Sequence, residues 1–225
     1  MTQPAVRQRA DVAAVRVGRG ADPLDFVPLA YQTWEGRDDD PDRTWRTLYL
    51  ASDAFGAWVE VLGRFRPHDD LMAALTDIAG EDGDPAPIPA GRVPLGWLSN
   101  RRVAHARVTG RFVDVGGPDT LRWLAQRLPE VLVRCGVRDL DLSAATGPQR
   151  ELTQAIAREL YLHGDTHAID YPSRYGATIR CIAMFETDGN LPNIQPVGTP
   201  YGPSIEADDH ALERAMRLHG LSWEL

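Results

Sequence analysis

The sequence predicts one mixed α+β domain. At 225 residues with 43% hydrophobic side chains, the chain has the length of one ordinary domain and enough apolar residues for a sizeable core. Strand and helix patterns follow one another without regular alternation, which favours a mixed sheet over a series of strand-helix-strand units. We expect the polar residues 1–11 to form a flexible N-terminus and residues 12–225 to form the domain.

The first half of the chain contains a strand followed closely by a helix. Thr47–Ala51 has strand character, and Ser52-Asp53 supplies a helix cap directly after it. Apolar residues then recur at helical spacing, which predicts a helix over Asp53–Arg64. We expect a second helix over Leu71–Ile78, followed by a surface loop over the Gly-, Pro- and Asp-rich segment Gly80–Gly91.

The second half of the chain supplies further strands and helices. Predicted strands cover Ala106–Val115, Ala168–Tyr171 and Thr178–Phe185. Predicted helices cover Thr120–Arg134, a segment that opens at Thr146 and ends at Gly164, and a C-terminal amphipathic segment that ends near Gly220. Because proline lacks a backbone N–H, Pro129 is expected to break or kink the first of these helices.

Composition and charge exclude several classes of function. A formal net charge of −8 argues against direct, sequence-independent binding of nucleic acid. All basic residues are arginine, so mechanisms that need a lysine amine are excluded, including Schiff-base catalysis and the phosphate-loop lysine. The sequence has neither an apolar run of about 18 residues nor a secretory signal, and we therefore expect a cytoplasmic protein without a membrane segment.

Candidate metal and thiol sites are weak. Cys135 and Cys181 have no metal-ligand spacing and are expected to be reduced core thiols. Four residues superficially resemble metal ligands: His163, Asp165, His167 and Asp170. Because a helix end and a glycine interrupt their spacing, we predict no metal site. The acidic run Asp38–Asp40 is expected to be a solvated loop.

Glu60 is the best-supported single candidate for chemistry. Gly56 and Gly63 flank it by four and three positions in the predicted helix, and each costs about 1 kcal/mol relative to alanine. Two glycines beside one carboxylate would let a ligand approach it closely. The alternative is that Glu60 pairs with Arg64 on a solvated helix face, which would contribute only about 0.2–0.5 kcal/mol.

Tyr49 and Ser173 are weaker candidates when each is taken alone. Tyr49 lies in the strand before the Glu60 helix, where its ring can converge on the carboxylate or simply pack in the core. Ser173 follows a short strand at a proline-enforced turn, where its hydroxyl is expected to face outward. No nucleophile elbow surrounds Ser173, so it is interpreted as a ligand-positioning or turn-stabilising hydroxyl.

Taken in order, four passages resemble the RES domain, the toxin half of Res–Xre toxin–antitoxin pairs. They are Val15–Phe26, Gly36-Arg37, Thr47–Leu62, and the pair Glu151–Arg158 with Ala168–Glu186. The resemblance covers about residues 14–187. It implies a fold similar to ADP-ribosyltransferases and an enzyme that consumes NAD⁺ by hydrolysis, phosphorolysis or transfer of ADP-ribose to a protein.

Carried over position by position, the family's conserved residues match five positions of this chain: Arg16, Arg37, Tyr49, Glu60 and Ser173. The resemblance assigns catalysis to Glu60, Arg37 and Tyr49, and NAD⁺ binding to Arg16, Arg37, Tyr49 and Ser173. The chemistry suits these residue types. A carboxylate stabilises the oxocarbenium character that develops on ribose, and an arginine holds pyrophosphate oxygens. NAD⁺ is then the substrate, and no further cofactor is implied.

The chain departs from the family pattern directly after Arg37, where Asp38–Asp42 replaces the usual aromatic residue and short polar turn. Clustered carboxylates would repel a pyrophosphate, which leaves three interpretations. The loop points away from the site, Arg43 takes the role of Arg37, or the enzyme has reduced activity. The third reading leaves a catalytically silent binding partner as the alternative function. An enzyme that cleaves another glycoside or nucleotide is a further alternative. The expected protein partner is an Xre-type helix-turn-helix antitoxin.

Overall fold

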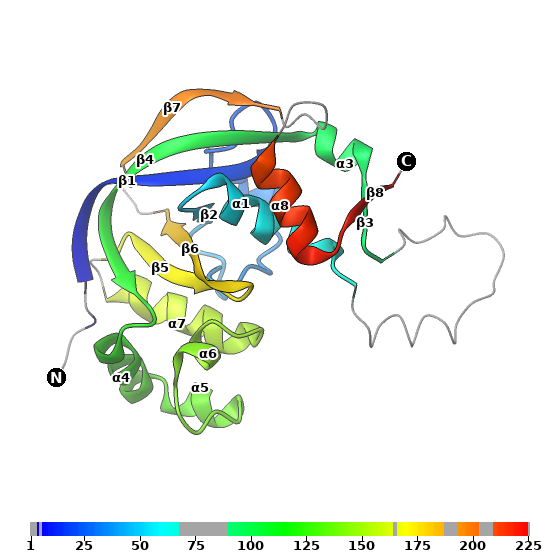
Figure 1. Ribbon diagram of the computed structural model, residues 1–225. Helices are drawn as coiled ribbons and strands as arrows, with labels where there is room; N and C mark the ends of the chain where they lie inside the picture. Colours follow the sequence, from blue (N-terminus) through cyan, green and yellow to red (C-terminus); the bar gives the residue numbers. More distant parts are fainter. Residues whose placement is uncertain are drawn as a thin grey trace, which may run out of the picture.

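The chain forms a mixed sheet covered by helices, as Figure 1 shows. The computed structural model describes residue 4 and residues 6–67, 90–163, 166–186, 193–202 and 209–224. The strands are β1 (Val6–Arg19), β2 (Thr47–Ala51), β3 (Arg92–Pro94), β4 (Arg101–Asp114), β5 (Ala168–Ser173), β6 (Gly176–Phe185), β7 (Asn193–Tyr201) and β8 (Ser222–Glu224). The helices are α1 (Ala54–Leu62), α3 (Leu95–Ser99), α4 (Pro118–Arg127), α5 (Pro129–Arg134), α6 (Leu142–Ala145), α7 (Arg150–Leu162) and α8 (His210–His219), with 3₁₀ turns at Leu29–Tyr31 and Gly63–Phe65. The predicted α+β class is confirmed.

The main sheet has the strand order β1-β2-β6-β5-β4-β7, and β1 also pairs with β4. The pairings β1–β2–β6–β5–β4–β1 therefore close into a circuit, and β7 adds to the outer edge of β4. All pairs are antiparallel except β4 with β5. A separate parallel pair, β3 with β8, lies beside α3 in Figure 1.

The first strand begins earlier than the sequence predicts. Residues 1–11 were expected to be a flexible terminus, but β1 starts at Val6, and Val6–Arg9 pairs with β4. Cross-strand hydrogen bonds from β4 explain this difference, since they give the polar segment partners that its own sequence does not reveal. Asp11, with φ at 56°, marks an irregularity in the ladder, and regular pairing resumes at Val12.

Several predicted helix boundaries are confirmed. Asp53 caps α1 by accepting a hydrogen bond from the Gly56 N–H at 2.8 Å. Pro129 separates α4 from α5, as expected from its missing N–H. Gly220 ends α8 with φ at 65°, in the left-handed region that glycine tolerates. The predicted helix at residues 71–78, most of the predicted loop at residues 80–91, and the terminating glycine at position 164 lie outside the described residues.

Alternation along the strands assigns each side chain to one of two cores. Leu48 and Leu50 of β2 join one apolar cluster with Ile182 and Met184 of β6. The intervening residues face the opposite way, toward a larger cluster that also contains the buried sides of α1, α4, α5, α7 and α8. In Figure 1, α8 lies against α1, while α4 to α7 gather at the end near β5. Tyr49 and Cys181 belong to this helix-covered face.

Short or proline-containing elements escaped the sequence prediction. The strands β3 and β8 span three residues each, which is too few for a periodic pattern. The longer β7 contains Pro196 and Pro200 and occupies an edge of the sheet, the position where strands tolerate proline.

Candidate active site

Glu60 projects from α1 toward the last residue of β5, Ser173, and the middle of β6, at Cys181. The Ser173 hydroxyl donates a 2.5 Å hydrogen bond to Glu60 Oε1, and the Cys181 thiol donates to the same oxygen at 3.6 Å. Burial and the nearby Glu60 charge both raise the pKa of the Cys181 thiol, which therefore stays protonated as a donor. The alternative considered from the sequence, an ion pair between Glu60 and Arg64, is absent from the described residues, where Arg64 instead lies over the Phe65 ring. Glu60 is thus oriented by neutral donors.

The two glycines beside Glu60 serve packing and not ligand approach, so that part of the sequence interpretation is wrong. A Cβ at Gly56 would lie 2.9 Å from Ile179 Cγ2 and 3.2 Å from Ala51 Cβ. A Cβ at Gly63 would overlap the ring of Tyr175. Both glycines let α1 approach the sheet and the β5–β6 turn closely, which brings Glu60 within reach of Ser173.

Ser173 is buried, and the expectation that its hydroxyl faces outward is wrong. A register irregularity between Pro172 and Ser173 interrupts the β5–β6 ladder at this point. Such irregularities re-aim side chains next to functional sites. The Ser173 hydroxyl donates to Glu60 and accepts the Tyr175 N–H at 3.0 Å. One side chain therefore stabilises the turn and positions the carboxylate.

Ser173→Ala is expected to lower the free energy of unfolding by about 1–3 kcal/mol, because it leaves the partly buried Tyr175 N–H without its acceptor and Glu60 without its closest donor. Urea denaturation of the two proteins measures this difference. Ser143→Ala, at an exposed position of α6, is the matched control and should change stability by less than about 0.5 kcal/mol. Equal stability of Ser173→Ala and the unchanged protein would contradict the assigned hydrogen bonds.

The acidic run after Arg37 is buried, which corrects the expectation of a solvated loop. Asp38, Asp39 and Asp40 are each less than 5% exposed. Asp40 caps the following turn by accepting from the N–H and the hydroxyl of Thr44. Asp39 and Asp40 thus have hydrogen-bond donors within the protein, whereas Asp38 Oδ2 is buried without a partner, and none of the three carboxylates lines the cavities described below.

Tyr49 ties this loop to β2. Its hydroxyl accepts the Asp38 N–H at 2.8 Å and donates to Asp39 Oδ1 at 2.9 Å. Asp39 Oδ2 accepts the Gly36 N–H at 2.7 Å, and a Cβ at Gly36 would lie 2.4 Å from the Tyr49 hydroxyl oxygen. Burial and the carboxylates of Asp38 and Asp39 raise the pKa of Tyr49, so it remains a neutral donor. The glycine before Arg37 is required because the loop passes so close to Tyr49.

Arg37 is directed into the molecule. Its guanidinium donates to the Thr146 carbonyl and lies 5.5 Å from the centre of the Tyr171 ring. Beside it, burial raises the pKa of Asp38 to about 7, although the Arg37 charge opposes this shift. Arg43 is exposed, with φ at 62°, and does not line either cavity near Glu60. The geometry therefore favours Arg37 over Arg43 as the second arginine of the site.

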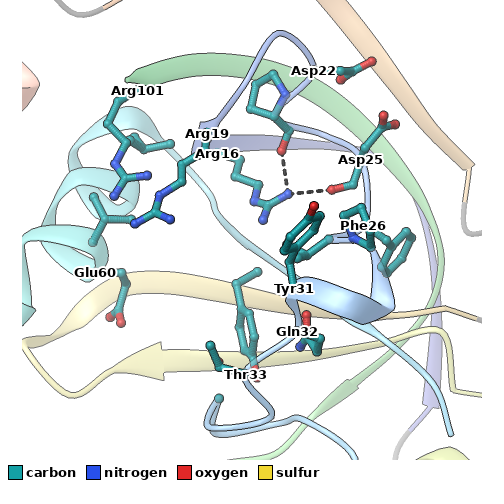
Figure 2. Close-up of a pocket in the computed structure, with 18 of the residues that line it drawn as sticks. Arg16, Arg19, Asp22, Asp25, Phe26, Tyr31, Gln32, Thr33, Glu60 and Arg101 are labelled. Carbon is teal, nitrogen blue, oxygen red and sulfur yellow. Dashed lines mark hydrogen bonds between the residues drawn. The ribbon is translucent and has the colours of Figure 1, made fainter. Parts of the chain in front are cut away.

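Glu60 lines two adjoining cavities, of about 990 and 300 Å³. Both are lined by Arg16, Gly36, Tyr49 and Glu60. The smaller one adds Arg37, Arg150, Tyr171 and Arg174, and the larger one adds Arg19, Arg64, Trp97 and Arg101. Cavities of about 300–1,000 Å³ are typical of small-molecule sites. Figure 2 shows Glu60 on the same side of the large cavity as Arg19 and Arg101, with Arg16 nearer the centre.

Arg16 forms hydrogen bonds with the loop that follows β1 and lines the cavity. Its Nη1 donates to the carbonyls of Pro23 at 2.6 Å and Asp25 at 2.9 Å, as the dashed lines in Figure 2 show. Burial lowers the pKa of Arg16 to about 10, against the opposing Asp25 charge, and the group stays cationic at neutral pH. Arg16 therefore brings a positive charge to the cavity and fixes the loop around it.

The described residues hold no cluster of three or more His, Cys, Asp or Glu placed to bind a metal. Asp170, one of the superficial metal-ligand candidates, pairs with Arg9 at 2.6 Å and Arg180 at 2.7 Å, and position 165 lies outside the described residues. Cys135 and Cys181 are both free; Cys181 is buried and Cys135 is partly buried. Among the helices that the structure describes, none is long and apolar enough to cross a membrane.

Sequence reasoning missed four residues at the site: Tyr171, Arg150 and Arg174, which line the smaller cavity, and Cys181, which donates to Glu60. Tyr171 and Cys181 are direct partners in the β5–β6 ladder, so both belong to the face that Glu60 meets. Strand alternation places Tyr171 two positions before Ser173, and this signal could have found it. Arg150 and Arg174 carry no comparable signal, because a helix start and a turn hold them at the cavity.

Comparison with known proteins gives a family and a fold. The family model described as RES domain matches residues 13–202. A chain of the crystal structure of the M. tuberculosis MbcT–MbcA toxin–antitoxin complex has a similar fold, with a TM-score of 0.51 and 14% sequence identity, over 96% of this chain and 92% of that chain. Among curated proteins, none matches the sequence.

Proposed function

Because the chain belongs to the RES domain family, we propose that it is a toxin that cleaves the bond between nicotinamide and ribose in NAD⁺. One observation carries this proposal: the Glu60 carboxylate, oriented by Ser173 and Cys181, lines two cavities that each contain four arginines, in a protein of net charge −8. An acidic protein that gathers arginines around one carboxylate suits an anionic substrate whose cleavage develops positive charge.

Each residue has a definite part in this chemistry. Cleavage develops oxocarbenium character on the ribose, and the Glu60 carboxylate stabilises that charge while it orients the acceptor. Arg37 and Arg16 bind the pyrophosphate, since a guanidinium pairs with phosphate oxygens in a fork geometry. The ring of Tyr49 contacts nicotinamide, and Ser173 holds Glu60 in place. Nicotinamide leaves with the bonding electron pair, and water, phosphate or a protein side chain supplies the new bond to the ribose carbon.

The acidic loop gives no support to a catalytically silent protein. Asp38, Asp39 and Asp40 are buried, and Asp39 and Asp40 accept hydrogen bonds from Gly36, Tyr49 and Thr44. None of these three carboxylates lines the two cavities at Glu60, so they do not occupy the place of an anionic substrate. The proposal retains an active enzyme with Arg37 as its second arginine.

The direct test is incubation of the purified chain with NAD⁺, with and without phosphate, followed by chromatography for nicotinamide. We expect nicotinamide release, accompanied by ADP-ribose in hydrolysis or by ADP-ribose carrying a new phosphate in phosphorolysis. ADP-ribose attached to the chain or to added protein indicates transfer. Parallel incubations with NADP⁺ and nucleosides separate this activity from cleavage of another glycosidic substrate. Intact NAD⁺ after prolonged incubation in phosphate would exclude the proposal.

We further propose that an antitoxin of the Xre helix-turn-helix type blocks the site. Support comes from the family and from the likeness to a chain of a toxin–antitoxin complex. Expression of this chain alone in the cytoplasm of a bacterium should deplete NAD⁺ and arrest growth, and co-expression of the adjacent reading frame should restore both. Growth arrest with unchanged NAD⁺ would contradict the assigned mode of toxicity.

A further inference from the structure

Three arginines gather at one end of the large cavity: Arg19 at the end of β1, Arg64 in the 3₁₀ turn after α1, and Arg101 at the start of β4. Arg19 and Arg101 are direct cross-strand partners in the β1–β4 ladder. Figure 2 shows Arg19 and Arg101 at the same end of the cavity, on the side where Glu60 lies. Arg64 follows Glu60 by four positions, which places the cluster about one helical turn from the carboxylate.

This arrangement is unfavourable in the empty protein. Like charges directly opposite each other on paired strands are destabilising. Arg101 is only 7% exposed, and its Nε is buried without a hydrogen-bond partner. Burial, followed by the charges of Arg19 and Arg64, lowers the pKa of Arg101 to about 10. The side chain nevertheless stays cationic at neutral pH.

Nothing in the described part of the chain neutralises the cluster. None of the three arginines forms an ion pair with a carboxylate there, whereas other partly buried arginines such as Arg46 and Arg180 do. Arg101 instead stacks on Trp97, with its guanidinium carbon 4.3 Å from the ring centre, which fixes the plane of its N–H groups at the cavity wall. The cluster therefore has fixed donors, surplus positive charge and an open side.

We propose that Arg19, Arg64 and Arg101 form a phosphate-binding subsite at this end of the large cavity, on residues other than Arg16 and Arg37. Guanidinium groups bind phosphate oxygens in a bidentate manner, and a phosphate dianion offsets the mutual repulsion of the three charges. The phosphate belongs either to the dinucleotide or to a free phosphate ion. The first source rests on the proposed function, and the second requires only the cavity.

Thermal unfolding of the full chain tests the subsite without turnover. In phosphate, compared with chloride at equal ionic strength, we expect the midpoint temperature of the unchanged protein to rise by about 4 °C or more. Arg19→Gln and Arg101→Gln should each lose this rise. Because Arg19→Gln removes a repulsive charge from an exposed position, its midpoint in chloride should equal or exceed that of the unchanged protein. This variant keeps the test valid if Arg101→Gln does not fold.

The matched control is Arg107→Gln, which removes one charge from the exposed side of β4, where Arg107 lies 3.6 Å from Asp11. This variant should keep the full phosphate response. An equal response in Arg19→Gln, Arg101→Gln and the control would overturn the subsite, as would no response in the unchanged protein.

Kinetics then identify the source of the phosphate. If it belongs to the dinucleotide, Arg19→Gln should raise the KM for NAD⁺ or NADP⁺ by about tenfold or more, the loss expected for one charge-assisted contact. If it is a free ion, the KM should stay constant and the dependence of turnover on phosphate should disappear. Either result supports the subsite. A phosphate response in a chain that leaves NAD⁺ intact would preserve the subsite and exclude the proposed cleavage.

Discussion

Glu60→Gln is expected to reduce the rate of nicotinamide release from NAD⁺ by about 10³-fold while leaving the affinity for NAD⁺ within a few-fold. The amide keeps the shape of the side chain and still accepts the Ser173 hydroxyl, but it carries no charge to stabilise the oxocarbenium-like ribose. Loss of one preorganised electrostatic contact in a shielded site typically costs about 10²–10³ in rate. Since the charge matters most in the transition state, the effect should appear in kcat.

Steady-state kinetics with chromatographic detection of nicotinamide measure this loss, and calorimetry with NAD⁺ checks binding by the variant. Glu213→Gln is the matched control, because the Glu213 carboxylate is exposed on α8 and lies 3.5 Å from the guanidinium of the exposed Arg217. The control should retain the full rate. Turnover by Glu60→Gln within a few-fold of the unchanged protein would remove the carboxylate from the mechanism and leave the cavity without its proposed catalytic residue.

Local sequence signals explain why the strand and the helix that carry Tyr49 and Glu60 could be predicted. The strand Thr47–Ala51, the cap at Asp53 and the following helix depend on residues within about one turn of each other. Strand alternation likewise places Tyr49 on the helix-covered face. The secondary structure of a segment can be predicted from the sequence alone where it depends on residues close by in the chain.

The contacts that orient the catalytic candidates join distant parts of the chain, and no local pattern encodes them. Ser173 and Glu60 are 113 positions apart, and Arg37 and the Thr146 carbonyl are 109 positions apart. The order of the family's passages predicted that these residues belong together. Their roles required the structure, which shows Ser173 as a buried donor to Glu60.

The acidic run shows why composition alone misassigns burial. Three consecutive aspartates usually face water, because an unpaired buried carboxylate is costly. Here the N–H of Gly36, the hydroxyl of Tyr49 and the N–H of Thr44 supply the donors that make burial of Asp39 and Asp40 tolerable. Asp38 is the exception, since its Oδ2 is buried without a partner.

Asp38→Asn is therefore expected to stabilise the protein at pH 8 by up to about 4 kcal/mol and to have little effect at pH 4. Burial raises the pKa of Asp38 from 3.8 to about 7 in the folded protein. The folded chain then holds its proton more tightly than the unfolded chain does, so the stability that this group contributes is complete below about pH 4. It falls as the pH rises from about 4 to 7, because the unfolded chain then loses the proton that burial makes the folded chain retain. Each unit of pKa difference corresponds to about 1.4 kcal/mol.

Denaturant titrations of both proteins between pH 4 and pH 8 measure this effect as a difference in the free energy of unfolding. The difference should widen with pH up to about 7 and then level off, because both states have then lost the proton. Asp119→Asn, at an exposed position of α4 beside Arg122, controls for general loss of negative charge and should give a difference that hardly changes with pH. A pH-independent difference for Asp38→Asn would mean that Asp38 ionises normally beside Arg37. The carboxylate would then partly neutralise the arginine proposed to bind the pyrophosphate, and Asp38→Asn should tighten NAD⁺ binding at neutral pH.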